Sequence, residues 1–296
     1  MRVSAAAAVW FVYLIVALVL LEFLTGFPYA AAVGLGGLGL AAVAPPPVGL
    51  RLRPDVADLA GALGVYAVCV GLFFLAFQVF TVDNVAGLFF AFAGALLVGV
   101  VAPLIHVVIV QGRALSDLGL TRERLPEILV LAALLAAVQA VLTLPKVSFG
   151  PPETWIPLLG MALAVGFFEA LFFRAYIVTI FEPMFGTVGA VVGSAGLYAL
   201  YHVGYGMGPT EMVFLFGLGI VYVVAYLVAR NLLVIWPLLT PLGGFFNNAR
   251  AGDIELPLIA VLGFVDILGV MLAAIFLVHR WQRRHAAELR REPVAR

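Results

Sequence analysis

Long apolar runs alternate along the chain with short polar segments. Eight runs have about the 20 residues that a helix needs to cross a bilayer, at 5–25, 57–81, 84–111, 126–145, 154–182, 186–205, 210–229 and 255–279. Two weaker candidates are the glycine-rich run 28–45 and the run 231–247, which prolines and glycines interrupt. None of these runs alternates apolar and polar residues as a strand would. The pattern predicts an all-α, polytopic transmembrane helical bundle of about eight to ten spans.

Composition supports this interpretation. The chain is 65% hydrophobic and 11% charged, whereas soluble domains carry about 25% charged residues. We therefore expect an integral membrane protein. Cys69 is the single cysteine, which excludes an internal disulfide and a thiolate metal cluster. The first apolar run has no clear cleavage site, so we interpret it as a retained span rather than a signal peptide.

The few charges are unevenly distributed. If the chain has ten spans, one side of the membrane carries most of the arginines, namely Arg2, Arg51, Arg53, Arg113, Arg122, Arg124, Arg230, Arg280, Arg283, Arg284, Arg290, Arg291 and Arg296. The opposite side carries Lys146 and Arg250 beside several acidic residues. Positively charged loops remain in the cytoplasm. We therefore expect both termini in the cytoplasm, in the plasma membrane of a prokaryote.

We divide the chain into four segments. Residues 1–50 form an N-terminal membrane helical pair and a Pro-rich linker, which includes the stiff run 45–47. Residues 51–114 add further membrane helices, and residues 115–250 form the membrane core. Residues 251–296 contain the last membrane helix and a basic cytoplasmic tail. Within this scheme, the mixed segment 111–126 is typical of chain lying at the membrane interface.

Glu169 and Arg174 interrupt the apolar run from Trp155 to Phe181. A charge at the centre of a membrane helix costs at least roughly 2.5–3.5 kcal/mol, so such residues usually have a function or a partner. Five residues rotate a helix by about 500°, which points the two side chains apart. Arg174 then needs another acceptor, for which Asp266 in the last run is the candidate. The alternative is a structural network of Glu169, Arg174 and Asp266 that sets helix register.

Tyr198 and His202 are four residues apart and share one helical face. The tyrosine ring can therefore pack beside the imidazole and orient it. A lone histidine is often only a satisfied core residue. At membrane depth, one helix away from a glutamate, we favour a functional role.

The run 236–248 contains two prolines and two glycines, which predict a broken helix. Irregular backbone at membrane depth is tolerated where it is buried in protein or lines a watery cavity. Thr240, Asn247 and Asn248 offer neutral polar groups there. Alternatively, the segment is a re-entrant packing element that the asparagines end at the interface, and the sequence leaves both interpretations open.

A buried carboxylate, a histidine and a polar helix break form a plausible set for hydrolysing a peptide bond. The carboxylate would take a proton from water, and the other groups would polarise the carbonyl or bind a metal. We therefore name Glu169 and His202 as catalytic candidates, and we name as supporting residues Arg174, Tyr198, Thr240, Asn247, Asn248 and Asp266.

These motifs resemble the CPBP family, intramembrane proteases related to the type II CAAX prenyl endopeptidase and to bacterial Abi proteins. The family pattern Glu-Glu-x-x-x-Arg is similar to Glu169–Arg174, and Phe-x-x-x-His is similar to Tyr198–His202. The Leu-Gly-Leu element at 118–120 is also like that of family members. The resemblance covers about 115–250 and implies that Glu169 activates water with His202 as its partner.

Two positions depart from the family pattern. Ala170 replaces the second glutamate, and no histidine lies between Val203 and Val278. The third family motif, His-x-x-x-Asn, therefore has Gly243 or Gly244 at its histidine position, with Asn247 or Asn248 as the asparagine. The resemblance implies a divalent metal such as zinc. Its ligands would be Glu169, His202 and neutral oxygens.

We expect an intramembrane endopeptidase, metalloprotease-like by resemblance, that hydrolyses a peptide bond near the cytoplasmic membrane face. The expected partners are membrane lipids and a peptide or protein substrate, without nucleic acid. A non-catalytic family member that binds a peptide or partner is the first alternative, which the missing histidine favours. A proton-coupled transporter that uses Glu169 and Asp266 as a relay is the third option.

Overall fold

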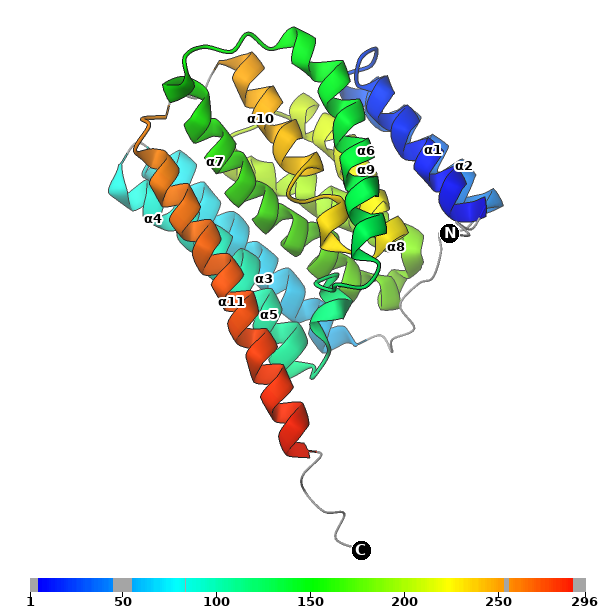
Figure 1. Ribbon diagram of the computed structural model, residues 1–296, viewed down its shortest axis with the longest axis vertical. Coiled ribbons are helices and arrows are strands. Elements are labelled where there is room, and N and C mark those ends of the chain that lie inside the picture. The colour runs from blue at the N-terminus through cyan, green and yellow to red at the C-terminus, as the bar shows by residue number, and fades with distance from the viewer. Residues whose placement is uncertain (1–4, 45–54, 83, 253–255, 290–296) are drawn as a thin grey trace, which may run out of the picture.

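The protein is a bundle of helices (Figure 1). The computed structural model describes residues 5–44, 55–82, 84–252 and 256–289, and this part of the chain contains no strand. Its longer helices are α1 (Ala5–Leu20), α2 (Gly26–Val43), α3 (Val56–Phe74), α4 (Val85–Ala93), α6 (Leu125–Thr143), α7 (Pro152–Glu169), α8 (Val178–Tyr201), α9 (Pro209–Ala229), α10 (Leu239–Ala251) and α11 (Ala260–Leu289). Shorter helical pieces are η1 (Leu75–Val79), η2 (Gly94–Val101), α5 (Ala102–Leu104), η3 (Ile105–Val110), η4 (Leu115–Leu118), η5 (Leu144–Lys146), η6 (Ala170–Ile177), η7 (His202–Tyr205) and η8 (Leu232–Val234).

The predicted all-α membrane bundle is confirmed. Eight continuous helical stretches among the described residues are long and apolar enough to cross a membrane. The longest, Pro152–Tyr205, contains a reversal at Gly186, where the backbone adopts φ 70° and ψ 175°. Only glycine enters that region readily, so this residue lets the arm α7–η6–α8 fold back on itself. Beside these eight stretches, the described residues include one shorter apolar helix, Ala6–Leu20.

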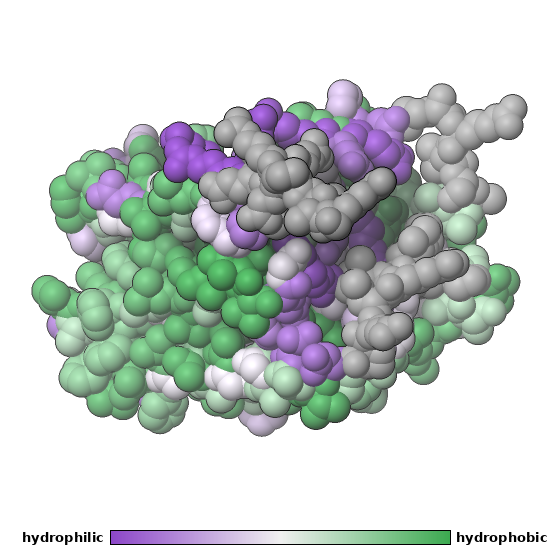
Figure 2. All heavy atoms as spheres, turned by 90° about the horizontal axis from the view of Figure 1, so that it is seen from below, coloured by the Kyte–Doolittle hydropathy of each residue, from purple (hydrophilic) through white to green (hydrophobic). Residues whose placement is uncertain are grey.

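One end of the bundle gathers the arginine-bearing segments. The side-chain amide of Gln282, near the end of α11, donates to the carbonyl of Arg113 at 2.7 Å. The turn after α9 is joined to the same region, because Asn231 Nδ2 donates to the carbonyl of Thr121 at 3.1 Å. We call this the arginine-rich end. Viewed from that end, hydrophilic residues gather across the middle while the flanks are hydrophobic (Figure 2), as expected for a protein surrounded by lipid.

The core lies where α7, η6, α8 and α9 meet. Every residue of η6 is buried, and most of the second half of α9 is buried with it. The N-terminal pair α1 and α2 packs on α6 and α9, whereas α11 packs along α7 (Figure 1). The Pro-rich linker at 45–47 lies outside the described residues. Within the segment 111–126, Leu115–Leu118 forms a short 3-10 turn in which Leu115 and Leu118 are buried.

Candidate functional site

Glu169 ends α7 in the middle of the core. It is partly exposed, and one carboxylate oxygen accepts a hydrogen bond from the Tyr201 hydroxyl. Tyr201 comes from the returning arm of the Gly186 reversal, so the reversal itself brings this pair together. Sequence reasoning gave Tyr201 no role. Its position one residue before the motif histidine is the signal that marks it.

His202 lies beside the same tyrosine. The two ring centroids are 4.1 Å apart, and Tyr198 packs edge-on against the imidazole at 4.9 Å, as its spacing predicted. His202 Nδ1 is 2.8 Å from the carbonyl oxygen of Tyr198. Because a carbonyl only accepts, Nδ1 carries the proton and Nε2 of the neutral ring presents a lone pair. Tyr201 thus links Glu169 to a histidine whose ring orientation is set.

Arg174 is fully buried without a carboxylate partner. Its carbon Cζ lies 3.7 Å from the centroid of the Tyr198 ring and 5.3 Å from that of Tyr222. One guanidinium nitrogen donates to the backbone carbonyl of Glu169 at 3.3 Å. Nε and Nη2 have no hydrogen-bond partner among the described residues. Aromatic faces attract a cation, but they do not satisfy its N–H donors, so this arginine keeps unused donors at the site.

The helix geometry between the two charges is unusual. Residues Ala170–Ile177 form a π-helix, in which hydrogen bonds reach back five residues and each turn is wider. π-helical turns occur frequently at functional sites. No ion pair joins the Glu169 and Arg174 side chains, although the predicted separation assumed α-helical rotation and this turn is π-helical. The wide turn instead leaves the guanidinium under the Glu169 carbonyl.

The run 236–248 is irregular only at its start, since residues 235–238 form a turn and α10 then continues through Pro241, Gly243 and Gly244. Its polar side chains do not reach Glu169 in any described contact. Thr240 is buried and its hydroxyl donates to the carbonyl of Ile235 at 3.2 Å, which closes the break. Asn247 is exposed, and Asn248 lines a cleft with Phe149 and Trp155 at the far end of α10. The packing interpretation of this segment is therefore the better one.

The predicted pairing of Arg174 with Asp266 is wrong. Asp266 is exposed on α11, and Arg174 lies in the core with its aromatic neighbours. The face of α11 that carries Asp266 points away from α7, so the carboxylate does not enter the bundle. The structural network of Glu169, Arg174 and Asp266 needed that contact, and the described residues do not form it.

The site lies away from the arginine-rich end. Tyr205, one turn beyond His202, packs on Phe77 with ring centroids 4.4 Å apart. Phe77 and Asp58 lie near opposite ends of the span that α3 and η1 form together. Asp58 is at the arginine-rich end. Glu169 is roughly midway along its arm, which runs from Pro152 to the reversal. The Glu169–His202 pair therefore lies deeper in the bundle than the arginine-rich end.

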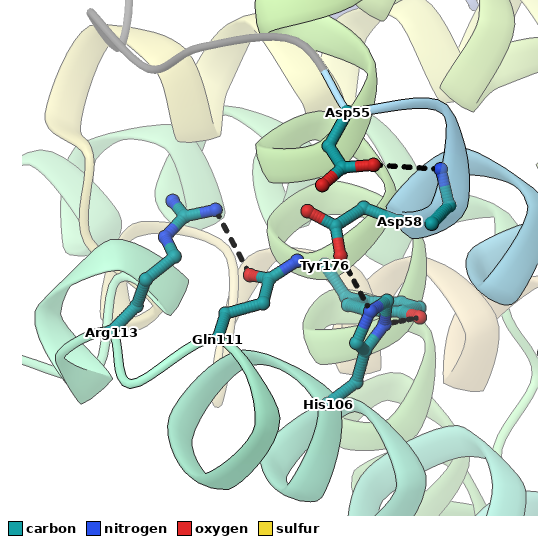
Figure 3. Close-up of polar contacts among 7 residues, drawn as sticks. Asp55, Asp58, His106, Gln111, Arg113 and Tyr176 are labelled. Carbon is teal, nitrogen blue, oxygen red and sulfur yellow. Dashed lines mark hydrogen bonds and ion pairs between the residues drawn. The ribbon is translucent and has the colours of Figure 1, made fainter.

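Sequence reasoning missed a second polar cluster, formed by Asp58, His106 and Tyr176 (Figure 3). His106 Nδ1 is 2.7 Å from the Tyr176 hydroxyl, and Nε2 is 3.1 Å from the Asp58 carboxylate. These residues come from α3, η3 and η6. Their separation along the chain is why no local motif revealed them. Gln111 and Arg113 form a neighbouring pair at 3.3 Å.

The donor set does not fit the implied divalent metal. Among the described residues, no group of three or more His, Cys, Asp or Glu side chains could hold a metal ion. Glu169 and His202 offer two ligands, whereas zinc sites in proteins use three or four. Thr240, a candidate neutral ligand, is committed to a backbone carbonyl. The chemistry proposed below therefore involves the chain's own groups.

The comparison with protein families agrees with the motifs. The family described as Type II CAAX prenyl endopeptidase Rce1-like matches residues 151–238. This segment begins at α7, contains Glu169, Arg174, Tyr198 and His202, and ends just before α10. No curated protein and no solved structure is similar enough to the chain to count as a match.

The fold defines the class: a polytopic integral membrane protein, of which residues 151–238 are similar to the Rce1-like family. Within that class, the Rce1-like segment confirms the resemblance to the CPBP family. The match stops before Gly243 and Asn247, so it carries no information on the third motif.

Proposed function

We propose that the protein is a CPBP-type intramembrane endopeptidase in which Glu169 activates water and His202 assists. One observation carries this proposal. Tyr201 holds the Glu169 carboxylate and packs on His202, so a base and an oriented imidazole share one neighbour at membrane depth. This pairing lies inside the Rce1-like segment.

In the proposed reaction, the transferred proton passes from water to Glu169 and then to the departing amine. The Glu169 carboxylate takes a proton from water while His202 Nε2 accepts a hydrogen bond from the same molecule. The water oxygen attacks the carbonyl carbon of the peptide and forms a tetrahedral intermediate. Protonated Glu169 then gives its proton to the departing amine. Arg174 supplies a positive charge close to the reacting groups, and its N–H donors without a partner, on Nε and Nη2, remain within the site.

The location of the site sets where cleavage takes place. If the arginine-rich end faces the cytoplasm, the bond is cut near mid-membrane and not at the cytoplasmic face. We infer that the substrate is a peptide or protein segment that enters the membrane-embedded part of the bundle.

The test uses purified full-length protein in proteoliposomes. A quenched fluorescent peptide ending in a prenylated cysteine motif, and its non-prenylated twin, serve as substrates. Wild type is expected to cleave at least one of them, whereas Glu169→Gln and His202→Ala should lose at least about 10²-fold in turnover. Glu153→Gln is the matched control, because Glu153 is an exposed carboxylate on the same helix. Full activity in either site variant would overturn the assignment.

The glycine at the third-motif position favours a second candidate, a family fold that binds a membrane peptide without cutting it. This candidate predicts that wild type and Glu169→Gln bind a labelled peptide equally well and that neither releases product.

A further inference from the structure

Gly243 and Gly244 are the two residues that can stand at the histidine position of the third motif. The structure distinguishes them. A Cβ atom built on Gly244 would meet nothing within 4 Å, and this residue is exposed. A Cβ atom on Gly243 would lie 2.6 Å from the Gln139 amide and 2.7 Å from the Tyr222 hydroxyl. Gly243 is therefore the residue that faces the interior.

Two buried polar side chains thus occupy the space that a side chain at 243 would fill. Gln139 lies on α6 and Tyr222 on α9, and both are nearly inaccessible. In the amide orientation that satisfies both backbone groups, Gln139 donates to the Leu239 carbonyl at 3.0 Å. Its oxygen then accepts from the Gly243 N–H, also at 3.0 Å. The Tyr222 hydroxyl lies beside the same amide, since a Cβ atom built on Gly243 would come within 2.7 Å of the hydroxyl and 2.6 Å of the amide. Gln139 therefore contacts both the start of α10 and the region of Tyr222.

Tyr222 also belongs to the Glu169 cluster. The Arg174 guanidinium carbon lies 5.3 Å from the centroid of its ring, while a nitrogen of the same group donates to the Glu169 carbonyl. Arg174 is thus a shared neighbour of Glu169 and Tyr222. The ring of Tyr222 therefore lies beside Arg174, and the hydroxyl of Tyr222 lies beside Gly243.

We propose that Tyr222, held by Gln139, donates a hydrogen bond to the carbonyl oxygen of the bond being cut, at the position where the family pattern has a histidine. A phenol has one proton and rotates freely about its C–O bond. At rest the hydroxyl faces Gln139, and when substrate is bound it donates a hydrogen bond to the carbonyl oxygen. The proton is not transferred and stays on Tyr222. The negative charge that develops on the carbonyl oxygen is stabilised. This inference rests on the proposed endopeptidase function.

The first experiment measures turnover of the proteoliposome substrates by Tyr222→Phe, which removes only the hydroxyl. Loss of one such donor typically costs 10²–10³-fold in kcat, so we expect a kcat at least about 10²-fold lower with little change in KM. Tyr226→Phe is the matched control, because Tyr226 is buried one turn further along the same helix and contacts Gly119. Its turnover should equal that of wild type.

The second experiment tests the packing on which the inference depends and needs no activity. Gly243→Ala places a methyl group against Gln139 and Tyr222, so its thermal midpoint should fall, whereas Gly244→Ala should leave the midpoint unchanged or raise it. Equal midpoints for the two variants would overturn the inference.

The outcomes separate the two proposals. If Glu169→Gln is inactive while Tyr222→Phe retains wild-type kcat, the role of Tyr222 is wrong and the proposed function stands. If wild type cleaves neither substrate, the proposed function fails and the role of Tyr222 fails with it. A matched loss in Tyr226→Phe would show a packing effect and would also overturn the inference.

Discussion

Two polar clusters use the same helical piece, η6, and differ in how well their hydrogen-bonding groups are satisfied. Arg174 is fully buried, yet Nε and Nη2 have no partner within the described chain. Two residues later, Tyr176 belongs to a cluster in which both nitrogens of His106 are hydrogen-bonded. Leaving a buried donor unsatisfied costs about 1–3 kcal/mol, and more for a charged group.

The difference indicates what each cluster is for. A satisfied network of carboxylate, imidazole and phenol joins three helices and contributes to stability. A buried cation with unused donors contributes poorly to stability, because its desolvation is not repaid. We therefore assign the Asp58–His106–Tyr176 cluster to structure and the Arg174 cluster to function. The two assignments predict different outcomes for variants of the two clusters.

The largest effect is expected for Arg174→Met. Methionine fills much of the space and removes an unsatisfied charge, so the free energy of unfolding should stay within about 1 kcal/mol of wild type or rise. Turnover should fall at least about 10²-fold, because the positive charge beside Glu169 is lost. Turnover in proteoliposomes and unfolding in detergent measure the two quantities. A stable, fully active variant would remove Arg174 from the site.

His106→Leu should show the reverse pattern. The change leaves the Asp58 carboxylate and the Tyr176 hydroxyl without their shared partner. The free energy of unfolding should fall by about 1–3 kcal/mol, while turnover per folded molecule stays at the wild-type value. His279→Leu is the control, since His279 is exposed on α11. If turnover falls while stability is unchanged, the two assignments are reversed.

Tyr201→Phe is expected to have an intermediate effect. The phenylalanine keeps the ring against His202 and removes the hydrogen bond to the Glu169 carboxylate. Turnover should fall about 10- to 10²-fold, because a hydrogen bond to a charged group contributes roughly 1.5–3 kcal/mol. Tyr13→Phe removes a hydroxyl from the N-terminal pair, where it donates to Val33, and should leave turnover unaltered. Unchanged activity in Tyr201→Phe would show that Glu169 does not depend on this tyrosine.

The smallest effect is expected for Asp266→Asn. Because the carboxylate is exposed on α11 and pairs with no described residue of the bundle, turnover should not change. A double-mutant cycle of Asp266→Asn with Arg174→Met should be additive within about 0.5 kcal/mol of unfolding free energy. A larger coupling energy would restore the pairing that the sequence analysis expected.

The spacing of individual residues predicted much of the site. Tyr198 and His202 pack together because positions four apart share a helical face. Glu169 and Arg174 form no ion pair, as predicted, but the prediction assumed an α-helix and the turn between them is π-helical. Partners from distant segments were beyond such reasoning. Tyr201 meets Glu169 through the reversal at Gly186, and Asp266 was assigned to Arg174 on charge alone, without knowledge of which face of α11 touches α7.

The sequence by itself determined that this chain is a polytopic bundle of membrane helices, since long apolar runs are stable in lipid only as helices. It also determined which residues carry the costly charges. The tertiary structure decided which of those charges meet. It also decided that Gln139 and Tyr222 fill the space beside Gly243, and that the site lies away from the arginine-rich end. The physical reason is that helix length and hydropathy are local properties, whereas contacts depend on how each helix is rotated and tilted against its neighbours.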